Sequence, residues 1–133
     1  MTFHLQIVTP DGKSFDGQAV RLIVPTIDGQ RGILARHINL VTALGMGTAK
    51  VVTEEGERYA ACIGGMLVVH DGAVKVVATT FEWSDNIDVE RAKASLARAE
   101  KMLEDPNKDA HTIQYANARI KRARVRISAA EKK

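Results

Sequence analysis

Short apolar runs, several of them alternating with polar residues, fill the first two thirds of the chain. Phe3, Leu5 and Ile7 alternate with polar neighbours, which is the two-residue period of a half-buried β-strand. Further β-rich runs are Ala19 to Val24 before Pro25, Ala49 to Thr53, Tyr59 to Ile63, Met66 to His70 and Ala73 to Ala78. Turn signals separate them at Thr9-Pro10-Asp11-Gly12, Asp28-Gly29, Glu55-Gly56, Gly64-Gly65 and Asp71-Gly72. This pattern predicts an antiparallel sandwich or barrel.

The apolar period changes to about 3.5 residues in the last third, which predicts two helices. The apolar positions are Val89, Ala92, Leu96, Ala99 and Leu103, then Ile113, Ala116, Ile120, Ala123, Ile127 and Ala130. The connector 104–109 contains Pro106 and three Asx residues, so we expect an antiparallel hairpin with Ser84 or Asp85 as the first N-cap. Each helix would bury only two or three large side chains, worth roughly 1.5 to 3 kcal/mol apiece before entropy is subtracted. We therefore hypothesise a marginal hairpin that can open or change partner.

The charge distribution divides the chain at the same place. The 133 residues have 19 Lys plus Arg and 16 Asp plus Glu, a net charge of +3. Residues 1–86 contain 7 basic and 9 acidic groups, net −2, whereas residues 87–133 contain 12 and 7, net +5. We therefore predict two domains, a β-sandwich over 1–86 and a helical hairpin over 87–133.

Composition restricts the classes of protein that this chain can belong to. With 45% hydrophobic and 26% charged residues, it has the balance of a soluble globular domain. An aromatic share of 5% argues against a stacking platform for single-stranded nucleic acid. The longest uncharged stretch, His37 to Ala49, is shorter than the ~18 apolar residues of a membrane helix. Because the first residues also lack a signal-peptide pattern, we expect a cytosolic protein or a peripheral one on a membrane complex.

The motifs of common enzymes are missing from the sequence. The run Gly45 to Lys50 leads into a predicted strand and does not match a phosphate-binding loop. The four histidines, His4, His37, His70 and His111, lack metal-ligand spacing. Cys62 lies in an apolar run without an evident base, which favours a buried structural thiol in a reducing compartment. We therefore predict a non-catalytic chain without a metal site.

Arginines on the predicted helices are the strongest chemical signal. Arg119, Arg122 and Arg126 lie at i, i+3 and i+7, and Arg91 and Arg98 are also seven residues apart. In a hairpin these side chains could converge, and guanidinium forks suit phosphate or carboxylate oxygens. The alternative is a solvated flank of a coiled coil, and the spacing alone leaves both interpretations open.

Four segments together resemble one known family. They are Ile7 to Gly12, Gly29 to Leu44, the glycine-pair strand Ile63 to Val69, and Ile87 to Ala92. In this order they are similar to the epsilon subunit of bacterial F-type ATP synthases, which is called delta in mitochondria. The resemblance implies a sandwich of about ten strands followed by a two-helix hairpin.

The resemblance also implies a role. The sandwich would be a docking domain that links the gamma subunit to the c ring in the central stalk. The hairpin would be a regulatory domain that can extend, reach the alpha and beta subunits and inhibit ATP hydrolysis. The chain would need no cofactor and would lie on the cytoplasmic face of the bacterial plasma membrane, in contact with the membrane only through the complex.

Two sets of site residues follow from the same resemblance. The c-ring contact loop would include Arg31, Leu34, His37 and Leu40. Ala35 and Asn39 stand where the family usually has prolines, so we expect a less rigid loop.

Some members of the family bind ATP as a regulatory ligand. Glu82, Ile87 and Asp88 would face adenine and ribose, Arg91, Arg98, Arg122 and Arg126 would surround the phosphates, and Ala92 would pack below. Phe81 and Trp83 differ from the family and could reshape the adenine side, although Trp83 could equally anchor the core between the two domains.

Two rival interpretations concern the basic hairpin. It could be a nucleic-acid or general anion-binding module, but a charge of +5 over two helices is modest, and we predict no nucleic-acid partner. It could also be an independent helical interaction adaptor.

Overall fold

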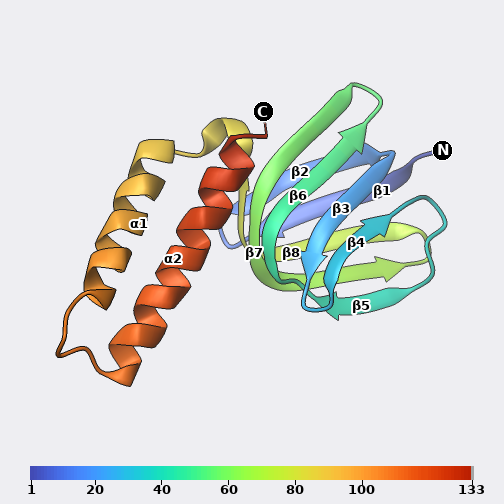
Figure 1. The fold of residues 1–133 in the computed structure, drawn as a ribbon. Helices are drawn as coiled ribbons and strands as arrows, with labels where there is room; N and C mark the ends of the chain where they lie inside the picture. Colours follow the sequence, from blue (N-terminus) through green and yellow to red (C-terminus); the bar gives the residue numbers. More distant parts are fainter. Residues whose placement is uncertain (133) are drawn as a thin grey trace.

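A computed structural model describes residues 1–132 and shows a β + α fold. The strands are β1 (Phe3–Thr9), β2 (Gly12–Ala19), β3 (Arg21–Thr26), β4 (Gly29–Ile33), β5 (Leu40–Ala43), β6 (Met46–Thr53), β7 (Gly56–His70) and β8 (Ala73–Trp83). A short 3-10 helix (Ser84–Asn86) leads to α1 (Val89–Leu103) and α2 (Ala110–Ala130). The predicted sandwich followed by a hairpin is confirmed (Figure 1), and its eight strands are close to the expected ten or so.

The eight strands form one hydrogen-bonded sheet that folds over on itself. Its order is β2-β1-β8-β7-β6-β3-β4, and β5 also pairs with β7. All pairs are antiparallel except β1 with β8. The first half of β7 pairs with β6 and its second half with β5. The strand therefore belongs to both layers.

A glycine pair lies where β7 passes from one layer to the other. We predicted that Gly64 and Gly65 separate two strands, and that prediction is wrong, because β7 is continuous through them. Both residues have positive φ, 69° and 119°, a region that favours glycine. The pair therefore bends a strand where we had expected a turn between two strands.

The apolar pattern did not identify three strands, β2, β4 and β5, and it gave different bounds for β3. The expected run Ala19 to Val24 contains the corner between β2 and β3, and β3 continues through Pro25 to Thr26. The strands β2 and β4 are mostly polar and exposed, so they lack the apolar alternation that identifies a half-buried strand. The strand β5 has only four residues.

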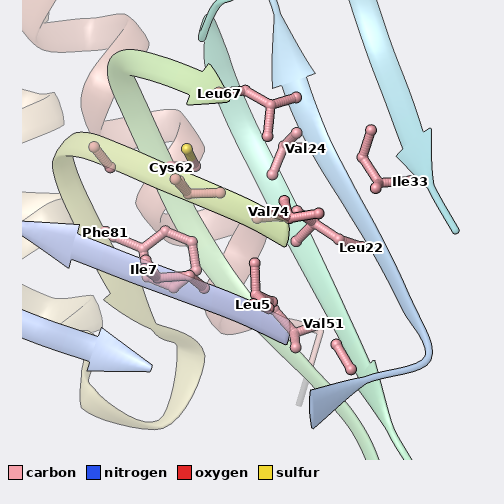
Figure 2. Packing of buried hydrophobic residues seen from close by; sticks show 14 of the residues in the cluster. Leu5, Ile7, Leu22, Val24, Ile33, Val51, Cys62, Leu67, Val74 and Phe81 are labelled. Carbon is pink, nitrogen blue, oxygen red and sulfur yellow. The ribbon is translucent and has the colours of Figure 1, made fainter. Parts of the chain in front are cut away.

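The main core lies entirely within the sandwich. Figure 2 shows side chains of β1, β3 and β8 meeting in the layer between the folded halves of the sheet. All buried members of this cluster belong to residues 3–83. Cys62 is fully buried in it, and burial raises the pKa of its thiol to about 12. Its burial within the core confirms the prediction of a buried structural cysteine.

The two helices begin at aspartate caps. The N-cap of α1 is Asp88, whose Oδ1 accepts from the Arg91 N–H at 3.1 Å. The expectation of Ser84 or Asp85 as this cap is wrong, because both lie in the 3-10 helix before it. Asp109 caps α2 by accepting from the Thr112 N–H at 2.7 Å. The predicted hairpin is confirmed, with α2 against β6 and β7 and α1 on the far side of α2 (Figure 1).

Small residues dominate the buried faces of the hairpin. The buried residues are Ala92 and Ala99 on α1 and Ala116, Ile120, Ala123, Ala129 and Ala130 on α2. Only Ile120 is large, so the helices bury little apolar surface, from which most hydrophobic stabilisation comes. This packing agrees with the hypothesis of a marginal hairpin. Its opening remains a prediction.

Candidate anion-binding crevice

A crevice of about 400 Å³ lies where the two helices meet the end of β8. Its lining residues are Glu82, Asn86, Asp88, Arg91, Ala92, Ser95, Arg98, Arg119 and Arg126. Four guanidinium groups and two carboxylates line it, so its walls carry a net charge of +2. A concave site with converging arginines is suited to an anion larger than a single carboxylate.

Regular periodicity positions most of these side chains. On β8, Phe81 and Trp83 are buried in the core, and alternation turns Glu82 to the opposite side of the strand. On α1, Arg91 and Arg98 are two turns apart on one face.

Two arginines of α2 are held by hydrogen bonds. The Arg126 Nε donates to Glu82 Oε1 at 2.6 Å, and each of these side chains is about one third exposed, 33% and 34%. This is the one ion pair between sandwich and hairpin in residues 1–132. The Arg119 Nη1 donates to Tyr115 Oη at 2.8 Å and its Nη2 to Ser95 Oγ at 3.3 Å.

The structure brings most of the expected ATP-binding residues together. Those that line the crevice are Glu82, Asp88, Arg91, Ala92, Arg98 and Arg126. Arg122 lies outside it but lines an adjoining hollow of about 140 Å³ with Ser95, Arg119 and Arg126. Ile87 differs from the expectation, because its side chain is 7% exposed and packs with Ala61, Ala129 and Ala130.

Three lining residues were not among those that the family resemblance implied. They are Asn86, Ser95 and Arg119. The arginine spacing on the second helix already placed Arg119 on the same face as Arg122 and Arg126, so the sequence contained a signal for it. Nothing comparable identified Asn86 or Ser95.

The two unusual aromatic residues belong to the sandwich core. The ring centroids of Phe81 and Trp83 lie 5.1 Å apart, and Trp83 Nε1 donates to the Ser14 carbonyl at 3.2 Å. The Arg58 guanidinium carbon lies 3.7 Å from the centre of the Trp83 ring. Neither aromatic side chain lines the crevice, and of the two alternatives for Trp83 its burial in the core favours that of a core anchor.

The expected c-ring loop is divided between strands and an exposed connection. Leu34 is exposed and His37 is half-buried between β4 and β5, whereas Arg31 lies within β4. Leu40 begins β5 and packs in part against the core. Ile38, which was not predicted, is 74% exposed.

Contacts of Asn39 and Ala35 anchor this loop. Asn39 Oδ1 accepts from the Asp71 N–H at 2.9 Å, and Ala35 packs against the core. The loop is thereby fastened to the turn between β7 and β8.

Two further findings concern the described residues. Within residues 1–132, no group of three or more His, Cys, Asp or Glu side chains is arranged to hold a metal ion. In the same range, neither helix is both long and apolar enough to cross a membrane.

The fold and the crevice define a class of small two-part protein, in which a β-sandwich carries a basic helical hairpin. Residues 2–84 match the family model for the ATP synthase delta/epsilon chain β-sandwich domain, and residues 85–131 match that for its long α-helix domain. The chain therefore belongs to the family of ATP synthase delta/epsilon chains, as the four sequence segments predicted.

Relatives match over nearly their whole length. The chain is 38% identical to the ATP synthase epsilon chain of an Exiguobacterium species over 128 residues, covering 96% of this chain and 94% of that one. It is 39% identical to that of Staphylococcus aureus over 135 residues, covering 99% and 98%.

Solved structures share the fold. A chain in the structure of the Euglena gracilis mitochondrial ATP synthase has a TM-score of 0.84 at 22% identity, covering 98% of this chain and 81% of that one. A chain in the central stalk and c-ring structure of the Tetrahymena thermophila enzyme has a TM-score of 0.65 at 16% identity, covering 96% and 95%.

Proposed function

We propose that this chain is a non-catalytic subunit in the central stalk of an F-type ATP synthase, where it links the gamma subunit to the c ring. Membership of the delta/epsilon family and full-length similarity to bacterial epsilon chains support this role. The exposed Leu34 and Ile38 and the half-buried His37 are suited to the c-ring contact, because they lie on a loop that the Asn39 hydrogen bond anchors to the turn between β7 and β8. The complex would hold the chain on the cytoplasmic face of the bacterial plasma membrane.

The hairpin is proposed to regulate ATP hydrolysis. Because its helices bury mostly alanines, little hydrophobic stabilisation is lost when α1 and α2 separate from each other or from the sandwich. Its net charge of +5 favours an acidic surface on the alpha and beta subunits as a second partner. An extended hairpin would then block rotation, and a folded one would permit it.

ATP is proposed as the ligand that keeps the hairpin folded, and the basic crevice is the observation that carries this proposal. Arginines from both helices would bind the phosphates, and the carboxylates of Glu82 and Asp88 would accept hydrogen bonds from the amino group and hydroxyls of the nucleoside. A ligand that touches α1, α2 and β8 together binds only the folded arrangement. It therefore stabilises that arrangement by mass action.

Calorimetric titration of the isolated chain with ATP, with and without magnesium, tests the ligand. We expect saturable binding that Arg122→Ala combined with Arg126→Ala abolishes. Arg124→Ala is the control, since Arg124 is exposed and lines a different hollow, beside β6. ATP should also slow amide exchange in both helices, and unchanged exchange at millimolar ATP would contradict the proposal.

Purification of the chain from its own cells under native conditions tests the assembly. We expect gamma, c and the catalytic-head subunits to accompany it. Recovery of a solitary protein would contradict the proposed position in the stalk.

A further inference from the structure

We propose that Arg119 recognises the terminal phosphate of the nucleotide and makes the crevice selective for a triphosphate over a diphosphate. This inference rests on the proposed ATP site and goes beyond the residues that the family resemblance implied. Arg119 lines both the crevice and the hollow beside Arg122. It is also partly buried, whereas Arg91, Arg98 and Arg122 are exposed.

The two ends of the crevice differ in their charged groups. Its sandwich end contains both lining carboxylates, Glu82 and Asp88, together with Asn86, and two arginines, Arg91 and Arg126, lie beside them. Its other end contains Arg98 and Arg119, which also line a hollow of about 550 Å³ with Met102 and Asp105 near the hairpin turn. Carboxylates repel phosphates and accept hydrogen bonds from neutral donors. A nucleotide would therefore place its nucleoside at the sandwich end and extend its phosphates toward Arg98 and Arg119.

The distance along the helices suits a chain of phosphates. Arg91 and Arg98 are seven residues apart on α1, and Arg119 and Arg126 are seven residues apart on α2. At 1.5 Å per residue each pair is separated by roughly 10 Å along its helix axis. Two parallel rows of this length can contact several phosphates in series, and the last phosphate would meet the pair farthest from the carboxylates.

Arg119 is oriented for this contact before any ligand arrives. Its hydrogen bonds to Ser95 Oγ and Tyr115 Oη use two of its five N–H donors, and its guanidinium carbon lies 5.5 Å from the centre of the Tyr115 ring. No other hydrogen bond of its side chain occurs within residues 1–132, which leaves three donors for an anion. Ser95 and Tyr115 are thus positioning residues, and they reduce the entropy that binding would otherwise cost.

The same arrangement explains how a terminal phosphate could fasten the hairpin. Arg98 belongs to α1 and Arg119 to α2, so one phosphate bound by both joins the two helices. A diphosphate placed the same way would end short of this pair. The folded hairpin would then respond to ATP more strongly than to ADP.

Calorimetric titrations of the full chain with ATP and with ADP, without magnesium, test the assignment. The unmodified chain should bind ATP more tightly than ADP. Arg119→Gln should weaken ATP binding by about tenfold or more, the effect of losing one charge-assisted contact, and leave ADP binding unchanged. Tyr115→Phe, which keeps the ring and removes the acceptor, should shift the ATP-to-ADP ratio in the same direction by less. Arg124→Ala is the control and should preserve the ratio.

The outcomes separate this inference from the proposed function. Unchanged ATP affinity in Arg119→Gln, or equal weakening of ATP and ADP, would overturn the role of Arg119 and leave the ATP site standing. Absence of ATP binding to the unmodified chain would overturn both. If circular dichroism shows that Arg119→Gln is unfolded, Arg119→Lys replaces it, because it retains the charge and loses the fork; an unchanged ATP-to-ADP ratio there and in Tyr115→Phe would overturn the role.

Discussion

Gly65 is the residue that most constrains the sandwich. Its φ is 119°, and a Cβ added there would lie 2.0 Å from the Val77 carbonyl oxygen and 2.8 Å from the Ala78 Cα. Both of these atoms are backbone atoms of the neighbouring β8, so no side-chain rotation can relieve the contact. Only glycine can therefore occupy the point where β7 crosses between the layers.

We predict that Gly65→Ala destabilises the protein severely. The backbone strain alone costs on the order of 1–3 kcal/mol, and the steric contact with β8 adds to it. Gly32→Ala is the matched control: Gly32 also lies in a strand, and a Cβ there would meet nothing within 4 Å. Urea unfolding of both variants measures the difference, and equal midpoints would show that β8 can move aside.

The sequence identified this glycine pair as a point where the backbone changes direction, but it did not show that the pair bends a continuous strand. A pair of glycines signals positive φ equally well in a turn and in a bent strand. What distinguishes the two is the pairing of Ile63 with Met46 before the bend and of Met66 with Ala43 after it. Those partners lie far away in sequence, so a local pattern cannot reveal them.

At the scale of elements, the start of α2 depends on one side chain. The Asp109 carboxylate accepts the Thr112 N–H, and this bond holds the pKa of Asp109 below its usual value. A carboxyl whose pKa is lower in the folded state stabilises that state above its unfolded pKa, and the contribution is lost as the pH falls through the folded value. The first turn of α2 should therefore loosen in acid.

We predict that Asp109→Asn removes this pH dependence at the first turn of α2. Asparagine is also a good N-cap but does not titrate in this range, so the helix should start at the same residue at all pH values. NMR shifts of the Thr112 and Ile113 amides between pH 6 and roughly pH 2.5, below the usual carboxyl pKa, provide the measurement. Identical titration curves in both proteins would assign the acid effect to another group.

The helices were more predictable than several of the strands, for physical reasons. A helix repeats its buried face within its own sequence, and the predicted stripes include Ala92, Ala99, Ala116 and Ile120, which are buried. The strands β2 and β4 are mostly exposed, and each pairs with a single neighbouring strand, β1 and β3 respectively. Because backbone hydrogen bonds do not depend on side-chain type, they produce no alternation of apolar and polar residues in the sequence. Likewise, the spacing predicted converging arginines, whereas the bond from Arg119 to Ser95 depends on how the helices are rotated.

At the scale of the whole molecule, the two parts differ in how they are stabilised. The main cluster of buried residues contains nothing beyond residue 83. A second cluster joins the parts through four buried residues: Ala61, Ile87, Ala129 and Ala130. Three of them are alanines, and one partly exposed ion pair, Glu82 to Arg126, supplements them. The sandwich therefore depends little on the hairpin, whereas the hairpin depends on the sandwich.

We predict that the hairpin opens before the sandwich unfolds. Amide exchange measured by NMR at increasing urea should show α1 and α2 opening together below the concentration at which β7 and β8 exchange. Glu82→Gln removes the ion pair and should lower the opening free energy of α2 by up to about 1 kcal/mol, the usual limit for a pair as exposed as this one. The sandwich amides should be unaffected, since the Glu82 side chain points away from their core. Exchange of helices and strands in a single global transition would instead make the protein one cooperative unit, and such a unit could not release its hairpin as the regulatory proposal requires.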